Sequence, residues 1–438
     1  MRFTAAEVAS VVGGELVGDD VEIDGARHDS REVTGGELFV PLVDQRDGHD
    51  FIGVALEAGA VAYFTAREPL GGAAIRVDDP ARALAQLGAH ARGRLPERVV
   101  GITGSVGKTS CKDLAAAAIG RRYETTASLR SFNNEYGVPL TLVNASPTAE
   151  AAVIEMGARG LRHIADLCAI AQPTVGVVTT VDAVHTELFG DIEQVALAKG
   201  ELIEHLPATG TAVLNDANPL VAAMADRARA SVLRYGSERA EVRASAVVVD
   251  DELRASFVLH TPWGDAPVRL AIRGEHHVGN ALAAASAALA VGVDLEQVAA
   301  GLGDAELSPW RMDLRLAPSG ARVLNDAYNA GPASMEAALR ALVRLDAVRH
   351  IAVLGPMAEL GDHSAVAHRR IADVAAELGV QIVAVAAPEY DALTVEHVAD
   401  QDAARLAIEP LRAADAVLIK GSRVAGLEHL AQALVDAD

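Results

Sequence analysis

The chain of 438 residues is half hydrophobic, and its length predicts about three domains at ~150 residues each. Its net charge of −22 and its 3% of aromatic residues argue against nucleic-acid binding, which uses clustered Lys and Arg and stacked rings. Cys111 and Cys168 are too few for a disulfide framework or a cysteine zinc site, so we expect a reducing compartment.

The first part of the chain shows no targeting pattern. Residues 1 to about 96 alternate short strand-like and helical pieces and end in a charged linker, 92–98, that contains both Gly and Pro. The start lacks a charged segment followed by an apolar stretch, and no apolar run approaches ~18 residues. We therefore expect a cytoplasmic protein without membrane insertion, with an N-terminal domain over residues 1–97.

The stretch 99–110 joins an apolar strand to a glycine-rich turn and then to a helix. Glycines let successive backbone N–H groups turn towards an anion, and the following helix adds its positive N-terminal end. Lys108 can reach terminal phosphates, and Thr109 offers a hydroxyl to Mg²⁺. Five residues separate Gly101 from Gly107 where the strict motif has four, so the loop is better described as Thr-Gly-x-x-Gly-Lys-Thr. The pattern predicts a nucleotide site.

The central region, 98–309, has the pattern of a parallel sheet buried on both faces. Apolar runs at 151–154 and 174–178 alternate with helical stretches. Residues 241–270 alternate with period two, which predicts an antiparallel ribbon. A boundary near 307–310 precedes a third unit, 310–438, with candidate strands at 322–326, 351–354, 381–385 and 416–419.

Three side chains of the central region have both a structural and a functional interpretation. Glu155 ends an apolar run, where a carboxylate can hold Mg²⁺ or cap a helix. His185 follows the next strand, but a lone His is usually structural and is an unusual Mg²⁺ ligand. Lys199 lies in a predicted helix and would by default be solvated. In the C-terminal unit, three polar loops follow strand ends, at 325–332, 355–361 and 420–423. They form a binding edge or are plain connections.

Taken together, these pieces resemble the Mur ligase family over nearly the whole chain. Within that family they are most similar to the ligases that add a D-alanyl-D-alanine dipeptide. The matching segments are Asp29–Arg31, Gly48–Phe51, Gly101–Ser110, Phe132–Thr141, Glu155–Gly157, His185, Ala198–Glu201, Ser308–Met312, Tyr328–Met335 and Lys420–Arg423.

The resemblance implies an α/β fold of three domains. These are a UDP-binding N-terminal domain, a central phosphate-loop ATPase domain with a parallel sheet, and a C-terminal Rossmann-like domain. It implies an ATP-dependent ligase of peptidoglycan precursor synthesis that adds D-Ala-D-Ala to UDP-MurNAc-tripeptide through an acyl phosphate. The implied cofactors are ATP and Mg²⁺, with two metal sites, and the implied partners are these small substrates alone. We expect a monomer.

The resemblance also assigns roles to single residues. The metal ligands implied are Thr109, Glu155, His185 and a carbamylated Lys199, and the catalytic set is Lys108, Glu155, His185 and Lys199. The ATP-binding residues implied are Thr103, Gly104, Ser105, Val106, Gly107, Lys108, Thr109, Ser110, His276, Asn280, Arg311 and Asp326. The substrate-binding residues implied are Ser30, Arg31, Asn133, Asn134, Tyr328 and Asn329.

Five positions depart from the family pattern. Thr180 and Asp182 lie in a segment where the family has Thr-Asn-x-Gly, and His277 stands where Asn is expected. Gly331 replaces an Asn, and Pro356 replaces an Asp. Because these changes cluster around the predicted ATP and amine sites, two alternatives stay open. One is a Mur-type ligase with a different amine donor, and the other is a catalytically weak nucleotide-binding regulator.

Overall fold

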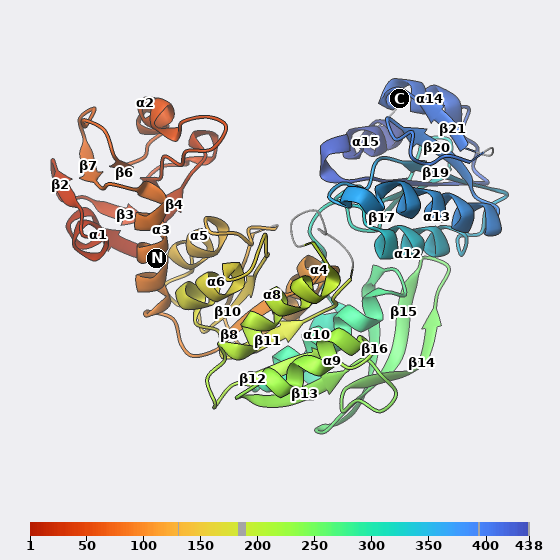
Figure 1. Cartoon of the computed structure of the whole chain (residues 1–438), viewed down its shortest axis with the longest axis horizontal. Coiled ribbons are helices and arrows are strands. Elements are labelled where there is room, and N and C mark those ends of the chain that lie inside the picture. The colour runs from red at the N-terminus through yellow and green to blue at the C-terminus, as the bar shows by residue number, and fades with distance from the viewer. Residues whose placement is uncertain (130, 183–189, 393–394, 437–438) are drawn as a thin grey trace.

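The computed structural model describes residues 1–129, 131–182, 190–392 and 395–436. It has three lobes, with the N-terminal and C-terminal lobes standing on opposite sides of a central one (Figure 1). Among the described residues, no helix is both long and apolar enough to cross a membrane.

The N-terminal lobe is built on a five-stranded sheet of order β2-β7-β6-β5-β4, beside a two-stranded pair of β1 and β3. Its helix α3 begins at Pro80, where the side chain of Asp79 accepts hydrogen bonds from the N–H groups of Ala81 and Arg82. The elements of this lobe are β1 Arg2–Thr4, α1 Ala5–Val12, β2 Glu15–Val17, β3 Glu22–Asp24, β4 Ala26–Arg27, β5 Leu38–Phe39, α2 Ile52–Glu57, β6 Ala62–Thr65, β7 Ala73–Arg76 and α3 Pro80–Arg92.

Helix α3 also joins this lobe to the central one. It packs on α5 (Gly137–Val143) so closely that a Cβ at Gly88 would lie 2.4 Å from the Cβ of Pro139. Asn144 adds a polar link, since its side chain accepts from the N–H of Ala26 and donates to the carbonyl of Ala26.

The central lobe contains a six-stranded sheet of order β13-β12-β11-β8-β10-β9, in which every pairing is parallel, as the sequence predicts. Alternate residues of one strand enter different cores, with Val99 in one and Val100 and Ile102 in the other, so the sheet is buried on both faces. Its elements are β8 Val99–Thr103, α4 Lys108–Ile119, β9 Thr125–Ala127, α5, β10 Ala151–Glu155, α6 His163–Ala171, β11 Val175–Val178, α8 Ile192–Glu204, β12 Thr211–Asn215, α9 Pro219–Ala222 and β13 Ser231–Tyr235.

The predicted antiparallel ribbon is confirmed. Strands β14 (Arg243–Val249), β15 (Arg254–Thr261) and β16 (Gly264–Arg273) form a three-stranded antiparallel sheet. Helices α10 (His277–Ala290) and α11 (Leu295–Gly303) follow it and pack on α4. The start of α10 is thereby brought beside the start of α4.

The C-terminal lobe has a six-stranded sheet of order β17-β18-β22-β19-β20-β21, parallel except for the edge strand β17. The four strands predicted from the sequence are β18, β19, β20 and β22. The elements are β17 Asp313–Leu316, β18 Arg322–Asn325, α12 Pro332–Leu342, β19 Arg349–Leu354, α13 Ser364–Glu377, β20 Gln381–Val385, β21 Val395–Val398, α14 Gln401–Ile408, β22 Asp415–Lys420 and α15 Glu428–Asp436. Ligands of such sheets gather beyond the carboxyl ends of the strands, and β18, β19 and β22 direct those ends towards the central lobe.

Candidate functional site

A cavity of about 670 Å³ lies between the central and C-terminal lobes. The central lobe contributes the turn after β8, the loop before α5, the end of β10 and the start of α10. The C-terminal lobe contributes the loops after β18, β19 and β22. The carboxyl ends of two parallel sheets thus face one cleft, which has the size of a small-molecule site.

The turn between β8 and α4 is a phosphate loop clamped from behind by the end of β11. The carbonyl of Thr180 accepts from the N–H of Ser105 at 2.8 Å, and the Thr180 hydroxyl accepts from the N–H of Val106 at 3.2 Å. Gly104 is needed there, because its φ is +148° and a Cβ would lie 1.9 Å from the Thr179 hydroxyl. The clamp fixes a loop whose N–H groups and helix dipole favour an anion.

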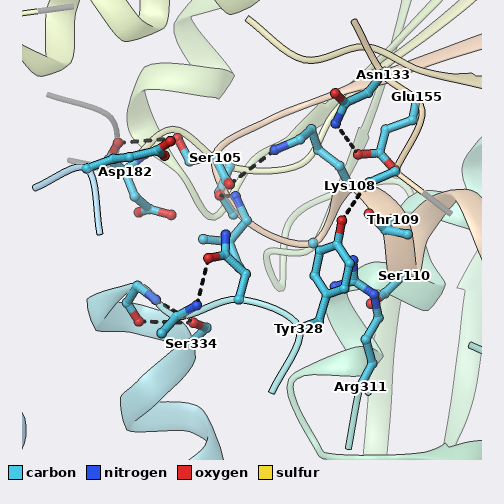
Figure 2. A pocket seen from close by; sticks show the side chains of 18 of the residues that line it. Ser105, Lys108, Thr109, Ser110, Asn133, Glu155, Asp182, Arg311, Tyr328 and Ser334 are labelled. Atoms are coloured by element: carbon cyan, nitrogen blue, oxygen red, sulfur yellow. Dashed lines mark hydrogen bonds between the residues drawn. The ribbon is translucent and has the colours of Figure 1, made fainter. Parts of the chain in front are cut away.

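Lys108 is the cation of this loop. Its Nζ donates to the carbonyls of Gly104, at 2.7 Å, and Ser105, at 3.3 Å, so the ammonium lies over the loop (Figure 2). Burial lowers the pKa of Lys108, and the carboxylates of Glu155 and Glu359 oppose that shift. Burial removes water from the ammonium, which costs free energy. A phosphate group bound at this loop would replace that water with a charge-assisted hydrogen bond.

Glu155 and Thr109 fit a Mg²⁺ ion that is shared with phosphates. The side chain of Glu155 is 1% exposed at the end of β10, and its Oε1 accepts from Asn133 Nδ2 at 2.8 Å (Figure 2). Its Oε2 is buried with no hydrogen-bond partner among the described residues. Within that part of the chain no group of three His, Cys, Asp or Glu could hold a metal, and Mg²⁺ beside phosphates commonly needs only one or two carboxylates.

Lys199 is buried on α8, with 2% of its surface exposed. Burial lowers its pKa well below the ordinary value, and the nearby Lys108 ammonium adds to the effect while Asp182 opposes it. The default expectation of a solvated helix lysine is therefore wrong. His185, the other residue whose role depended on the family resemblance, lies outside the described residues.

The start of α10 contributes two side chains that bond to each other. Asn280 Nδ2 donates to His277 Nδ1 at 3.0 Å, which leaves Nε2 as the protonated ring nitrogen. His277 is 3% exposed, and its Nε2 has no partner among the described residues. Burial lowers the pKa of His277 well below its ordinary value, so the ring is neutral. Its neighbour His276 also lines the cavity.

The wall from the C-terminal lobe is held by charged and aromatic contacts. The guanidinium of Arg311 lies 4.0 Å from the ring centre of Tyr328, whose hydroxyl donates to Ser131 of the central lobe (Figure 2). Lys420 is 3% exposed and pairs with Asp326 at 2.5 Å, and the other oxygen of Asp326 accepts from the N–H of Met312. Asp326 thus ties β18 to the segment that enters this lobe.

Most of the residues predicted from the sequence meet in this cavity. Those that line it are Ser105, Val106, Gly107, Lys108, Thr109, Ser110, Asn133, Asn134, Glu155, His276, Asn280, Arg311, Asp326, Tyr328 and Asn329. Of the five departures, Thr180, Asp182, His277 and Gly331 line it, and Pro356 does not.

Five of the predicted residues that the structure describes do not line the cavity. Thr103 is the last residue of β8, Gly104 is the first residue of the phosphate loop, and Lys199 is buried on α8. Ser30 and Arg31 lie in the N-terminal lobe, where Arg31 is exposed and holds the pKa of Asp29 down to about 2 through a side-chain hydrogen bond.

The sequence analysis did not single out several residues that line the cavity, namely His28, Ser131, Tyr136, Arg159 and Glu359. His28 comes from the N-terminal lobe, and its ring lies edge-on to Phe132 at 5.7 Å between centres. Two of them had a sequence signal, since Glu359 lies in one of the three polar loops at strand ends and Tyr136 lies in the segment Phe132–Thr141 that matches the family pattern.

The phosphate loop, the buried carboxylate and the facing second sheet define a protein that binds a nucleoside triphosphate between two α/β lobes. Comparison with known proteins gives the family. The Mur ligase middle domain matches residues 102–288, and the Mur ligase glutamate ligase domain matches residues 310–423.

Full-length relatives agree with these matches. The UDP-N-acetylmuramoyl-tripeptide–D-alanyl-D-alanine ligase of Mycobacterium tuberculosis is 37% identical over 100% of this chain and 98% of its own length. The crystal structure of MurF from Acinetobacter baumannii has a TM-score of 0.88 and 30% identity, covering 100% and 99% of the two chains. MurF from Thermotoga maritima in complex with ADP has a TM-score of 0.81 and 27% identity, covering 93% and 96%. The chain belongs to the Mur ligase family, and its similarity is to the MurF members.

Replacing Lys108 by Ala should remove the cation beneath the phosphates while the fold survives. Hydrogen bonds to charged groups contribute about 1.5–3 kcal/mol, so ADP affinity should fall by about 10–100-fold. Calorimetric titration with ADP measures this change, and the thermal midpoint checks folding. Arg121→Ala removes an exposed cation just beyond the far end of the same helix and should leave affinity unchanged. Equal ADP affinity in Lys108→Ala and wild type would contradict the assignment.

Proposed function

We propose that this protein is an ATP-dependent, ADP-forming ligase that joins D-Ala-D-Ala to UDP-MurNAc-tripeptide in peptidoglycan precursor synthesis. The observation that carries the proposal is the single cleft in which a phosphate loop, a buried carboxylate and the polar loops of a second sheet converge. The full-length similarity to ligases of that name supports the choice of substrates. In this proposal residues 1–97 bind the UDP part, residues 98–309 bind ATP, and residues 310–438 close over the nucleotide.

The proposed reaction has two steps and needs no protein nucleophile. The terminal carboxylate of the tripeptide attacks the γ-phosphate of ATP, which gives an acyl phosphate and ADP. The amine of the dipeptide then attacks the acyl carbon, and phosphate leaves. The protein positions the reactants, offsets charge on the transferring phosphoryl group with Lys108, and excludes water that would hydrolyse the intermediate.

We assign Mg²⁺ to two sites in this cleft. Thr109 and Glu155 would hold one ion together with phosphate oxygens, and the buried, unpartnered Oε2 of Glu155 supports that assignment. His185 and a carbamylated Lys199 complete the proposed ligand set. Bound Mg²⁺ supplies positive charge that stabilises the transferring phosphoryl group.

Carbamylation of Lys199 suits its environment. The lowered pKa favours the neutral amine, which can add to CO₂ and lose a proton to give a carbamate. The carbamate places an anion beside the Lys108 ammonium, and its oxygens are hard ligands suited to Mg²⁺.

The remaining roles follow the position of each residue around the cleft. His276 and Asn280 at the start of α10 would face the adenine, and Arg311 and Asp326 would reach the phosphates and ribose from the C-terminal lobe. Asn133 and Asn134 would place the tripeptide, while Tyr328 and Asn329 would shape the dipeptide site. Ser30 and Arg31 would hold the UDP part.

The direct test is phosphate release by purified protein with ATP and Mg²⁺. Release should require both UDP-MurNAc-tripeptide and D-Ala-D-Ala, and mass spectrometry should detect the pentapeptide product. Single D-amino acids and L-Ala-L-Ala serve as alternative amine donors. Turnover with another donor alone would contradict the dipeptide assignment, and nucleotide binding without any turnover would favour a regulator.

Lys199→Ala should lose most ligase activity, and formate or acetate should restore part of it by refilling the vacant anionic position. Lys112→Ala, which removes another buried lysine, is the matched control and should not respond to these anions. Activity is measured over a range of acetate concentrations at constant ionic strength. If neither the Lys199→Ala substitution nor the removal of bicarbonate from the buffer changed the rate of the ligase reaction, that result would contradict carbamylation.

A further inference from the structure

The loop after β19 places a carboxylate in the cleft on the side of the C-terminal lobe. Residues 358–360 of this loop line the cavity, opposite the phosphate loop of the central lobe. Glu359 has a φ of +65°, a left-handed conformation that costs free energy for a residue with a side chain. Such conformations persist where the surrounding structure enforces them, and they are common at functional sites.

The neighbours of this loop hold its shape through several hydrogen bonds. The Tyr390 hydroxyl donates to the carbonyl of Gly355 at 3.1 Å, and the N–H of Met357 donates to His368 Nε2 at 2.9 Å. The N–H of Ala358 donates to the Ser422 hydroxyl at 2.8 Å. His368 and Tyr390 are themselves buried and in edge-on ring contact, so the loop rests on a rigid support.

Glu359 and Lys108 line the same cavity, Glu359 from the C-terminal lobe and Lys108 from the central lobe. A group that bridges the space between them would lie beside the terminal phosphate of a nucleotide held by Lys108. The second step of the proposed reaction takes place at that point.

The C-terminal lobe contributes several small residues to the cavity. Ala330, Gly331, Ala333, Ala337 and Ala358 line it beside the larger Tyr328, Leu360 and Lys420. Small apolar residues can contact the methyl side chains of a ligand without steric conflict. This cavity suits a short peptide of small residues with its amino group directed at the carboxylate.

The second step of the proposed reaction needs a proton acceptor near the amino group, and a carboxylate can serve as one. A free α-amino group has a pKa of about 8, so near neutral pH the dipeptide arrives largely as an ammonium ion. It must lose one proton before its nitrogen can attack, and the nitrogen must lose another as the amide forms. A base held within hydrogen-bond distance contributes about 10²–10⁴-fold to such a step.

We propose that Glu359 is a catalytic residue that binds the amino group of the incoming dipeptide and accepts the proton that its nitrogen loses during amide formation. The nitrogen forms a bond to the acyl carbon, the bond from that carbon to the phosphate oxygen breaks, and phosphate leaves with the electron pair. The proton passes from nitrogen to the Glu359 carboxylate and then to solvent or phosphate. The assignment rests on the proposed ligase function.

The test separates the two steps with hydroxylamine. This small nucleophile is largely unprotonated at neutral pH and traps the acyl phosphate as a hydroxamate without needing a base. Wild type, Glu359→Gln, Glu359→Asp and the control Glu377→Gln, which changes an exposed carboxylate at the end of α13, are assayed with ATP and UDP-MurNAc-tripeptide. Each is given either D-Ala-D-Ala or hydroxylamine.

We expect Glu359→Gln to lower kcat with the dipeptide by about 100-fold and to raise the KM for the dipeptide by about tenfold. Hydroxamate formation should stay within twofold of wild type, Glu359→Asp should recover part of the loss, and Glu377→Gln should match wild type. An equal loss of activity with the dipeptide and with hydroxylamine would assign Glu359 to phosphoryl transfer and overturn the proposal. No loss in either assay would also overturn it. Absence of both products from wild type would overturn the ligase function itself.

Discussion

Burial of charge at one edge of the central sheet is the constraint on which the rest of the structure depends. Lys108, Glu155 and Lys199 lie within or beneath the cleft, where an isolated charge is costly because it loses hydration. Partners within the chain satisfy them only in part, since Oε2 of Glu155 has none among the described residues. A bound triphosphate would supply negative charge near the lysines, and its Mg²⁺ would supply positive charge near Glu155. The cleft is therefore organised around a ligand.

Among the described residues, few polar contacts join the central and C-terminal lobes. The Tyr328 hydroxyl reaches Ser131, and Arg344 pairs with Glu275 at 2.9 Å. The last pair is half exposed on both sides, and such pairs contribute about 0–1 kcal/mol. The charged side chains that each wall directs into the cleft therefore contribute more than these direct contacts to bringing the two lobes together. Binding of the nucleotide and closure of the lobes are coupled in this account.

Local patterns in the sequence predicted much of this molecule. The apolar runs gave the parallel strands β10 and β11, and period-two alternation gave the antiparallel ribbon of β14 to β16. The glycine-rich turn at 104–107 was recognisable because the residues that allow a phosphate loop to turn are consecutive in the sequence. The short edge strands β17 and β21 were not predicted, since edge strands have half-exposed faces and weak patterns.

Long-range contacts were beyond such patterns. Nothing near His28 in the sequence indicates that it reaches the central cleft, and Ser131 gains its role only through Tyr328 of another lobe. Lys199 has the sequence of a solvated helix lysine, and only the packing of α8 shows that it is buried. The loop that carries Glu359 is held by hydrogen bonds to Tyr390, His368 and Ser422, which belong to other segments of the C-terminal lobe.

The central claim is that this cleft activates a carboxylate by transferring a phosphoryl group to it, and an isotope experiment tests that claim most directly. UDP-MurNAc-tripeptide labelled with ¹⁸O in its terminal carboxylate is converted with ATP and D-Ala-D-Ala, and the released phosphate is analysed by mass spectrometry. The account predicts one ¹⁸O atom in each phosphate formed from doubly labelled carboxylate. Phosphate free of ¹⁸O, formed in step with product, would contradict it.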